Sequence, residues 1–286
     1  MGELPRRSFL LRTSGLALAS PLLMSNYAAA NAATQSPPSI RWLLPSAALT
    51  AVTATPAASH ALDQTQPFVV RGSRSTVIPA GWDATPVAYF TSYAAIAQAL
   101  GGGSLAPNVK GIIYNNENWQ FTPLAEQQNP AQYEKLGAAL AHAHGLLFIS
   151  APAVDLVTVL APDSGLTRYG TYLQLGLAAD AARYADVIDI QAQDSETAPS
   201  VYADFVMQAA AQARQANPDV LVFAGVSTNP NGQRVTANDI LGAIAVTRDS
   251  VDGYWLNIPQ ASEYCPACND FRPDIAVEVI TSLAAA

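Results

Sequence analysis

Asn115 and Glu117 follow directly after an apolar run, in the sequence Gly-Ile-Ile-Tyr-Asn-Asn-Glu-Asn-Trp of residues 111–119. Side chains alternate along a β-strand, so a strand that continues through this segment places Asn115 and Glu117 on one face. A carboxyl group in a partly apolar pocket has its pKa raised, and it can then donate a proton as a general acid. The segment therefore predicts Glu117 as a catalytic acid, with Asn115 beside it.

Polar or aromatic side chains also follow most of the other apolar runs, and amides outnumber acids among them. Amide groups hydrogen-bond neutral hydroxyl and acetamido groups, and the face of an aromatic ring packs on the apolar face of a sugar ring. This set favours a carbohydrate ligand over a phosphate or a metal ion. The predicted substrate-binding residues are Arg71, Gln191, Gln193, Asp194, Asn229, Trp255 and Asn257.

The spacing of these residues supports a shared site. Gln191 and Gln193 are two residues apart, as are Trp255 and Asn257, so each pair shares one face of its strand. A structural interpretation stays open for both pairs: the amides tie loops together, and Trp255 belongs to the core.

A second carboxylate is available from three acids, Asp155, Asp194 and Glu196. A conventional glycosidase uses two carboxyl groups whose separation sets the stereochemical outcome, and the sequence does not give that separation. The alternative for Glu117 is a structural acid that forms a salt bridge at the end of its strand.

Three further side chains within the runs are expected to be structural. Asp189 is predicted to be buried and paired, or to sit at a strand start. Tyr114 and Trp119 are predicted to pack under the helices that surround the sheet.

The histidines and cysteines limit the other chemistries. His60, His142 and His144 are the only histidines. His142 and His144 are two residues apart at a helix end and do not share a face, so no zinc site is predicted. No histidine follows a strand and no Gly-x-Ser-x-Gly motif is present, so no Ser-His-Asp triad is predicted. Cys265 and Cys268 form a Cys-x-x-Cys motif in a loop after the last apolar run. A redox-active pair needs its first cysteine at a helix N-terminus in a thioredoxin-like fold, and a metal site needs two more ligands. A short-range disulfide is therefore predicted.

Eight apolar runs alternate with helical patterns, which predicts an α/β fold, a single-domain (β/α)₈ TIM-type barrel. The first two βα units are irregular, because residues 46–66 show no clear helical period, and an open doubly wound sheet is the alternative. The predicted strands are at 40–45, 68–73, 86–90, 111–119, 146–152, 186–193, 220–226 and 251–259. The predicted helices are at 92–100, 130–144, 172–184, 201–216, 236–245 and from 273 onward.

The N-terminal segment predicts export. Arg6-Arg7 precedes a short apolar run and an Ala-rich stretch, as in a twin-arginine signal. The run is shorter than the ~20 residues that span a bilayer, which argues against a membrane anchor. The predicted organisation is a signal over 1–33, a linker over 34–39 and the barrel over 40–286. The protein is expected to use the twin-arginine export machinery, to be secreted, and to have no membrane contact after signal removal.

The overall charge restricts the partners. Lys and Arg number 14 against 22 Asp and Glu, which gives a formal net charge of −8. Nucleic acids and anionic membranes select clustered basic residues, so neither is expected as a partner. Neither a Gly-x-Gly-x-x-Gly motif nor a Walker-type loop follows an apolar run, and no cofactor is predicted.

The Asn-x-Glu segment on the fourth strand and Trp255 on the eighth resemble glycosidases of the family-18 chitinase and family-85 endo-N-acetylglucosaminidase type. The resemblance implies that Glu117 is the acid, that Asn115 orients a substrate acetamido group and that Trp255 forms the floor of the sugar site. Substrate-assisted enzymes of this type need no second carboxylate. The chain departs from the chitinase pattern Asp-x-x-Asp-x-Asp-x-Glu, since Ile113 stands where that pattern has an acid.

These features predict a secreted glycosidase-like hydrolase that acts on a polysaccharide or glycan, with Glu117 as its general acid. The alternatives are a carbohydrate-binding barrel without catalysis and an exported barrel enzyme of other chemistry.

Overall fold

The eight predicted strands form a closed parallel barrel in which each strand pairs with the next along the chain and β8 pairs with β1. The structure is a computed structural model that describes residues 40–71 and 78–285. The predicted export signal and linker, and the last two residues of the second predicted strand, lie outside this range. The strands are β1 (Arg41–Pro45), β2 (Phe68–Arg71), β3 (Thr85–Phe90), β4 (Gly111–Tyr114), β5 (Leu147–Ser150), β6 (Val187–Ile190), β7 (Leu221–Ser227) and β8 (Gly253–Asn257).

Apolar side chains on both faces of the strands explain why these segments form a buried parallel sheet. The inward face fills the barrel with a cluster that includes Leu43, Phe68, Val87, Ile113 and Phe223. Outward-facing residues of the same strands pack under the helices in two further clusters. The barrel interior is therefore a packed core, and only its end is open to a ligand.

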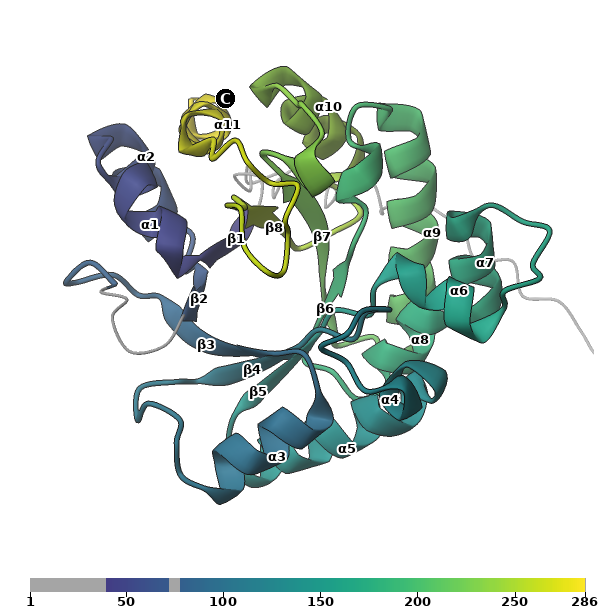
Figure 1. Ribbon diagram of the computed structural model, residues 1–286. Helices are drawn as coiled ribbons and strands as arrows, with labels where there is room; N and C mark the ends of the chain where they lie inside the picture. Colours follow the sequence, from purple (N-terminus) through teal and green to yellow (C-terminus); the bar gives the residue numbers. More distant parts are fainter. Residues whose placement is uncertain (1–39, 72–77, 286) are drawn as a thin grey trace, which may run out of the picture. The chain divides into compact units, whose positions relative to one another are not determined.

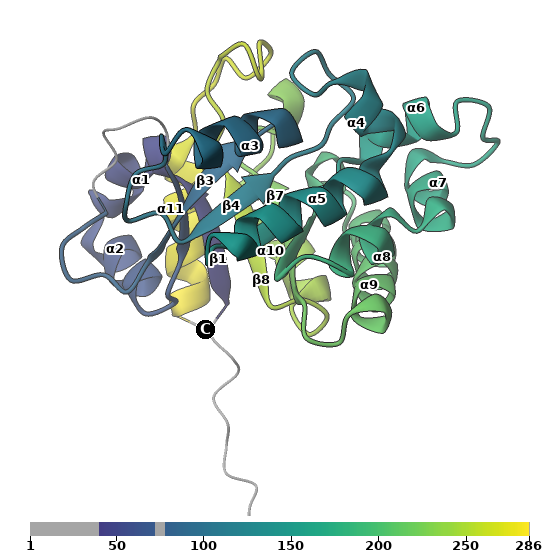
Figure 2. The same cartoon turned by 90° about the horizontal axis from the view of Figure 1, so that it is seen from below.

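Helices surround the strands (Figure 1), and Figure 2 shows the loops after β4 and β8 leaving the barrel on one side, opposite the C terminus. The α-helices are α1 (Ser46–Thr53), α2 (Pro56–Asp63), α3 (Tyr93–Gly101), α4 (Leu124–Gln128), α5 (Pro130–Ala143), α6 (Val157–Leu160), α7 (Arg168–Leu175), α8 (Leu177–Ala182), α9 (Pro199–Ala216), α10 (Ala237–Thr247) and α11 (Pro273–Ala284). Short 3₁₀ turns occupy η1 (Val154–Leu156), η2 (Gln193–Ser195) and η3 (Pro230–Gly232).

Local capping explains where two of the predicted helices begin. The Ser92 hydroxyl accepts a hydrogen bond from the backbone N–H of Ala95, 3.2 Å away, at the start of α3. Thr236 and Asp239 form a reciprocal capping box at the start of α10.

The predicted helix at 172–184 is wrong as a continuous element. It is two helices, α7 and α8, that meet at Gly176, whose φ of 68° lies in the left-handed region. This conformation ends a helix and suits glycine.

The segment at 46–66, for which no element was predicted, contains α1 and α2. Neither begins with a side-chain cap, since Pro45 and Thr55 hold the cap positions without one. The two helices pack against α11 through buried side chains, among them Leu49, Val52 and Leu62. Their stability therefore comes from tertiary packing, which the spacing of apolar residues along the sequence does not reveal.

Gly253 begins β8 in close contact with residues of β1 and β7. A Cβ atom there would lie 2.5 Å from the carbonyl oxygen of Arg41 and 2.7 Å from the ring of Phe223. We expect Gly253→Ala to lower the free energy of unfolding by about 1–3 kcal/mol, the usual cost of overpacking a core. Urea unfolding measures it, with the open position Gly165→Ala as the control; equal stability of both variants would contradict this packing.

Within residues 40–71 and 78–285, no helix has both the length and the apolar character needed to cross a membrane.

Candidate functional site

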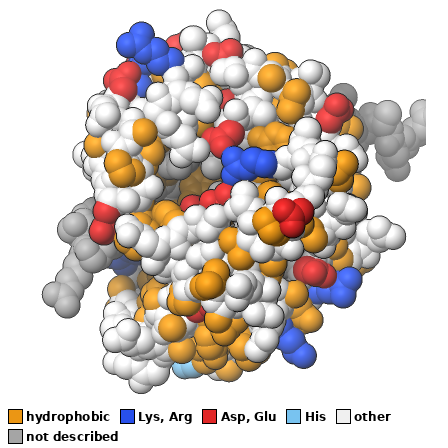
Figure 3. All heavy atoms as spheres, turned by 45° about the vertical axis from the view of Figure 1, so that its right-hand side comes forward, with side chains coloured by type: hydrophobic (Ala, Val, Ile, Leu, Met, Phe, Trp, Pro, Cys, Tyr) orange, Lys and Arg blue, Asp and Glu red, His pale blue; other side chains and the backbone are white. Residues whose placement is uncertain are grey.

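A cavity of about 830 Å³ opens at the carboxyl ends of the strands. We refer to it as the mouth cavity. Figure 3 shows a hollow near the middle of one face, with acidic and basic side chains close to its edge. The predicted site residues that line the mouth cavity are Arg71, Glu117, Gln191, Gln193, Asp194, Asn229, Trp255, Asn257, Cys265 and Cys268.

A smaller chamber of about 90 Å³ lies deeper in the barrel, and we refer to it as the inner chamber. It shares Glu117, Gln191, Gln193, Trp255 and Asn257 with the mouth cavity. The predicted residue Asn115 lines only this chamber, as do Asp189, Gly225 and Val226, whereas Tyr89 lines both cavities. The alternation predicted from sequence thus brings the ends of β4, β6 and β8 to one place.

Asn115 is the centre of a hydrogen-bond network on the chamber wall. Its amide nitrogen donates to Glu117 Oε1 at 2.5 Å and to the Tyr89 hydroxyl at 2.7 Å. Its oxygen accepts from Gln191 Nε2 at 2.6 Å, and the same Gln191 nitrogen donates to the Ala151 carbonyl at 3.0 Å. Asn115 follows β4, and its amide is held by Tyr89 of β3 and by Gln191, which follows β6. The fixed amide in turn orients the Glu117 carboxyl.

The Glu117 carboxyl is half-buried and has its pKa raised to about 7. Burial is the main cause, and the negative charges of Asp155 and Asp194 add to it. Hydrogen bonds from Asn115 and Gln191 oppose the shift by stabilising the carboxylate. An acid with this pKa holds its proton in a substantial fraction of molecules near neutral pH. No ion pair joins Glu117 to a basic side chain of the described residues.

Trp255 forms part of both cavities and is only half-buried. Its ring meets Tyr89 edge to face, with centroids 6.4 Å apart. Its indole nitrogen is buried and has no hydrogen-bond partner in the described part of the chain. The ring thus combines core packing with an unused donor beside the inner chamber.

Asp189 is buried, as predicted, but it lies inside β6 rather than at the strand start, and the predicted pairing is absent at its Oδ1 atom. Its side chain is 1% exposed, and Oδ1 has no hydrogen-bond partner among residues 40–71 and 78–285. Burial raises the pKa of Asp189 to about 8. It faces the barrel interior two residues before Gln191, and so it lines the inner chamber.

Gln193 reaches the chamber from η2, just beyond the end of β6. A Cβ atom on Gly225 would lie 2.6 Å from Gln193 Oε1, so the glycine makes room for this amide. Oε1 is buried and lacks a partner in the described structure. The chamber therefore holds an unused acceptor as well as an unused donor.

The three acids considered as a second carboxylate differ in their surroundings. Asp155 and Asp194 line the mouth cavity. Asp155 accepts a hydrogen bond from the Asn118 backbone at 3.0 Å, and burial raises its pKa. Glu196 does not line the cavity; it is 1% exposed, accepts from the Ser227 backbone N–H at 3.0 Å, and has its pKa raised by burial to about 9. Its contacts are those of a structural acid.

Two arginines of the described ranges line the mouth cavity. Arg71 donates to the Asn108 side chain and lies at the end of β2. Arg168, at the start of α7, was not predicted; its positive charge acts on Asp155. It follows a polar loop rather than an apolar run, so a search of strand ends does not find it.

The predicted disulfide between Cys265 and Cys268 is present, with Cα atoms 5.4 Å apart. Cys268 is buried, and its sulfur lies 3.6 Å from the carbonyl oxygen of Asn229. The disulfide therefore closes a short turn within the loop after β8, and this turn packs beside Asn229, which follows β7.

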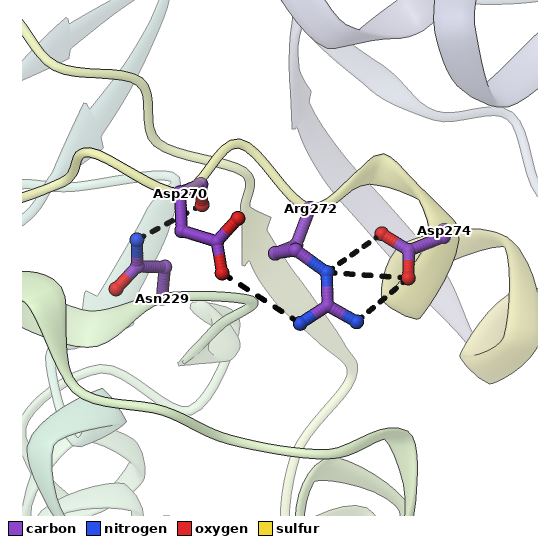
Figure 4. A network of polar contacts seen from close by, with 4 residues as sticks. All are labelled: Asn229, Asp270, Arg272 and Asp274. Atoms are coloured by element: carbon purple, nitrogen blue, oxygen red, sulfur yellow. Dashed lines mark hydrogen bonds and ion pairs between the residues drawn. The ribbon is translucent and has the colours of Figure 1, made fainter.

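A second set of contacts holds the same loop (Figure 4). Asn229 donates through Nδ2 to the Asp270 carbonyl at 3.0 Å. The Arg272 guanidinium binds Asp274 at 2.7 Å and lies 3.8 Å from the carboxylate of Asp270. Asn229 was predicted to bind substrate; it lines the cavity, but its amide nitrogen also holds the rim.

The prediction for Tyr114 agrees with the structure, whereas that for Trp119 is wrong. Tyr114 packs under α3 and α5 with Ile96 and Phe148, and its hydroxyl donates to Glu126 at 2.7 Å. Trp119 lies on the rim of the mouth cavity. The chain leaves β4 after Tyr114, so strand alternation no longer governs Trp119.

Tyr89 was also missed. It lies in β3 in phase with Val87 and lines both cavities. The predicted strand at 86–90 already contained Tyr89, so the alternation that predicted Asn115 and Glu117 would have found it if it had been applied to this strand.

The histidines lie away from both cavities. His142 contacts Asp186 on the outside of the barrel, with its Nε2 atom 2.9 Å from the carboxylate. Within the described ranges, no group of three or more His, Cys, Asp or Glu side chains is arranged to hold a metal ion.

Comparison with known proteins identifies the fold. The sequence matches no protein-family model. No curated protein matches it in sequence. Among solved structures, the chain is similar to a chitinase from Chromobacterium violaceum, with a TM-score of 0.51 and 12% identity over 86% of this chain and 99% of that one.

Two other solved structures are also similar. A family-18 (GH18) chitinase from Pseudoalteromonas aurantia has a TM-score of 0.36 and 12% identity over 63% of this chain and 70% of that one. A sugar phosphate isomerase/epimerase from Parabacteroides distasonis has a TM-score of 0.47 and 8% identity over 90% and 98%. Likeness at such identities shows the fold alone. In fold, the chain is a (β/α)₈ TIM barrel.

Proposed function

We propose that this protein is a glycosidase that acts on a polysaccharide or glycan containing N-acetylhexosamine, with Glu117 as the general acid. The observation that carries the proposal is the setting of Glu117. Its carboxyl has a pKa raised to about 7 and lies between an amide-lined cavity and an inner chamber. An enzyme that breaks a glycosidic bond near neutral pH needs such an acid.

In the proposed reaction, protonated Glu117 gives its proton to the leaving oxygen while the bond from that oxygen to the anomeric carbon breaks. The Asn115 amide, held by Tyr89 and Gln191, keeps the carboxyl in place. When the proton has left, the same Asn115 nitrogen stabilises the carboxylate. Gln191, Gln193 and Asn257 orient the sugar.

The inner chamber supports an acetamido substituent on the sugar. Its unused donor, Trp255 Nε1, complements a carbonyl oxygen, and its unused acceptor, Gln193 Oε1, complements an amide N–H. A buried polar atom without a partner costs about 1–3 kcal/mol, so residues with such atoms beside the chamber favour a ligand that carries both a carbonyl oxygen and an N–H group. In substrate-assisted hydrolysis the acetamido oxygen attacks the anomeric carbon as the bond to the leaving oxygen breaks, and water then opens the cyclic intermediate, gives up its proton to the Glu117 carboxylate and restores the acetamido group. The enzyme therefore needs no second carboxylate as nucleophile.

The direct test is a screen of the mature protein against cell-wall, fungal and plant glycans, with release of reducing ends as the readout. We expect release from glycans that contain N-acetylhexosamine. Release from none of the glycans would overturn the proposal. Binding without release would instead identify the barrel as a carbohydrate-binding protein.

The pH dependence of the reaction follows from the Glu117 pKa of about 7. The acid works only when protonated, so kcat/KM is at its plateau below this pH and falls about tenfold for each pH unit above it. Initial rates between pH 5 and 9 on one soluble substrate measure this. A profile that rises through pH 8 would be incompatible with a proton donated by Glu117.

We also propose export and secretion through the twin-arginine machinery, supported by Arg6-Arg7 and the apolar, Ala-rich sequence that follows. The test is secretion of the full chain against an Arg6→Lys, Arg7→Lys variant. We expect the variant to stay inside the cell; equal secretion of both would contradict this route.

A further inference from the structure

Three aromatic rings from two distant parts of the chain meet at the edge of the mouth cavity. Trp119 and Phe121 belong to the loop after β4, and Tyr264 belongs to the loop after β8. Ring centroids lie 5.1 Å apart for Trp119–Phe121, 5.7 Å for Trp119–Tyr264 and 4.8 Å for Phe121–Tyr264. We refer to these three residues as the aromatic rim.

The rim presents two of its rings to the cavity. Trp119 and Tyr264 line it, whereas Phe121 does not and packs against both of them. Tyr264 is 52% exposed, a large value for a tyrosine that contacts two other aromatic rings. A tyrosine that served only to pack would be expected to bury more of its surface.

Both sides of the rim are held rigidly. The Trp119 indole donates to Thr122 Oγ1 at 2.7 Å, and Gln127 Nε2 donates to the Trp119 carbonyl at 2.9 Å. On the opposite side, the Cys265–Cys268 disulfide follows Tyr264 directly. Rings fixed in this way lose little freedom when a ligand binds, which favours affinity.

The rim lies next to the proposed acid centre. Glu117 is two residues before Trp119, and both line the mouth cavity. Burial raises the pKa of Tyr89, and Glu117 and Tyr264 add to this effect, so the rim tyrosine is close to the residues around the acid. A cavity of about 830 Å³ also exceeds what a single sugar ring at Glu117 would fill.

We propose that the aromatic rim is a second sugar-binding subsite, which holds a pyranose unit of a chain whose scissile bond lies at Glu117. Aromatic faces bind the apolar faces of pyranose rings, and the amides at the acid centre bind their hydroxyls. The inference rests on the proposed function for its ligand class. It adds that the substrate is an extended chain rather than a mono- or disaccharide unit.

The test measures binding rather than turnover, in full-length Glu117→Gln, by calorimetry. The probes are the β-linked dimers and hexamers of glucose and of N-acetylglucosamine. We expect one hexamer to bind at least about tenfold more tightly than its dimer, because it alone reaches the rim. Trp119→Ala and Tyr264→Ala should each remove about tenfold of hexamer affinity and leave the dimer unchanged.

Two controls separate a subsite from a damaged fold. Phe271→Ala removes an exposed aromatic residue that does not line the cavity, and it should change neither affinity. Trp119→Phe keeps a ring and should restore most of the hexamer affinity, with the thermal unfolding midpoint reported for every variant.

The outcomes distinguish this inference from the proposed function. Equal affinity for hexamer and dimer, equal weakening of both by Trp119→Ala, or binding of no oligomer would overturn the subsite. A hexamer that binds through the rim but is not hydrolysed by the native protein would support the subsite and overturn the glycosidase.

Discussion

Glu117→Gln should lower kcat for glycan hydrolysis about 10²–10⁴-fold, the usual contribution of a general acid. Glutamine keeps the shape of the side chain and can still accept the hydrogen bond from Asn115 at its oxygen. It cannot release a proton to the leaving oxygen. The fold should therefore persist while bond cleavage is lost, and steady-state release of reducing ends measures the change.

A matched control is Glu278→Gln, which makes the same substitution at an exposed position on α11, away from both cavities. It should leave kcat unchanged. Asp155→Asn adds a comparison, since Asp155 lines the cavity and adds to the raised pKa of Glu117. Removing its charge should move the alkaline limb of the pH profile toward lower pH. A Glu117→Gln variant that retained native kcat would show that another group donates the proton.

Asp189→Asn should stabilise the protein at alkaline pH. The pKa of Asp189 is raised from its ordinary 3.8 to about 8 by burial, so the folded state holds this proton more tightly than the unfolded state. Stability from this group is fully present below about pH 4 and is lost as pH rises to about 8. Asparagine does not ionise, so the variant escapes this loss of stability, which is roughly 6 kcal/mol as an upper limit at 1.36 kcal/mol per pKa unit.

The measurement is the free energy of unfolding of both proteins at pH 4.5 and pH 8.5. All other titrating groups are common to the two proteins, so the change in their difference isolates Asp189. We expect a small difference at the lower pH and a higher stability of Asp189→Asn at the higher pH. A difference independent of pH would mean that Asp189 titrates in the folded protein as it does in water.

The alternation of side chains along each strand predicted most of the residues that face the barrel interior. It placed Asn115 with Ile113, Gln191 with Asp189 and Trp255 with Gly253, because every barrel strand has one face inward. That information ends where the strand ends. Trp119 follows β4 by five residues, and its place on the rim depends on contacts with Tyr264, which is 145 positions away in the sequence.

Other features depend on packing and electrostatic energies, which the pattern of residue types in the sequence does not show. Asp189 was predicted to be buried and paired, or to sit at a strand start; it is instead a buried acid inside β6 whose raised pKa favours the neutral form. Helices α1 and α2 were missed because packing against α11 replaces caps and amphipathic period. Arg168 lies at a helix start rather than a strand end, and only the closed barrel brings it to the cavity.

The most direct test of the central claim compares two substrates in Glu117→Gln. One is a glycan, whose leaving oxygen must be protonated, and the other is the 2,4-dinitrophenyl glycoside of the same sugar, whose leaving group departs without a proton. If Glu117 is the general acid, the variant loses about 10²–10⁴-fold of its kcat/KM on the glycan and little on the dinitrophenyl glycoside. An equal loss on both substrates would contradict the assignment of Glu117 as the proton donor.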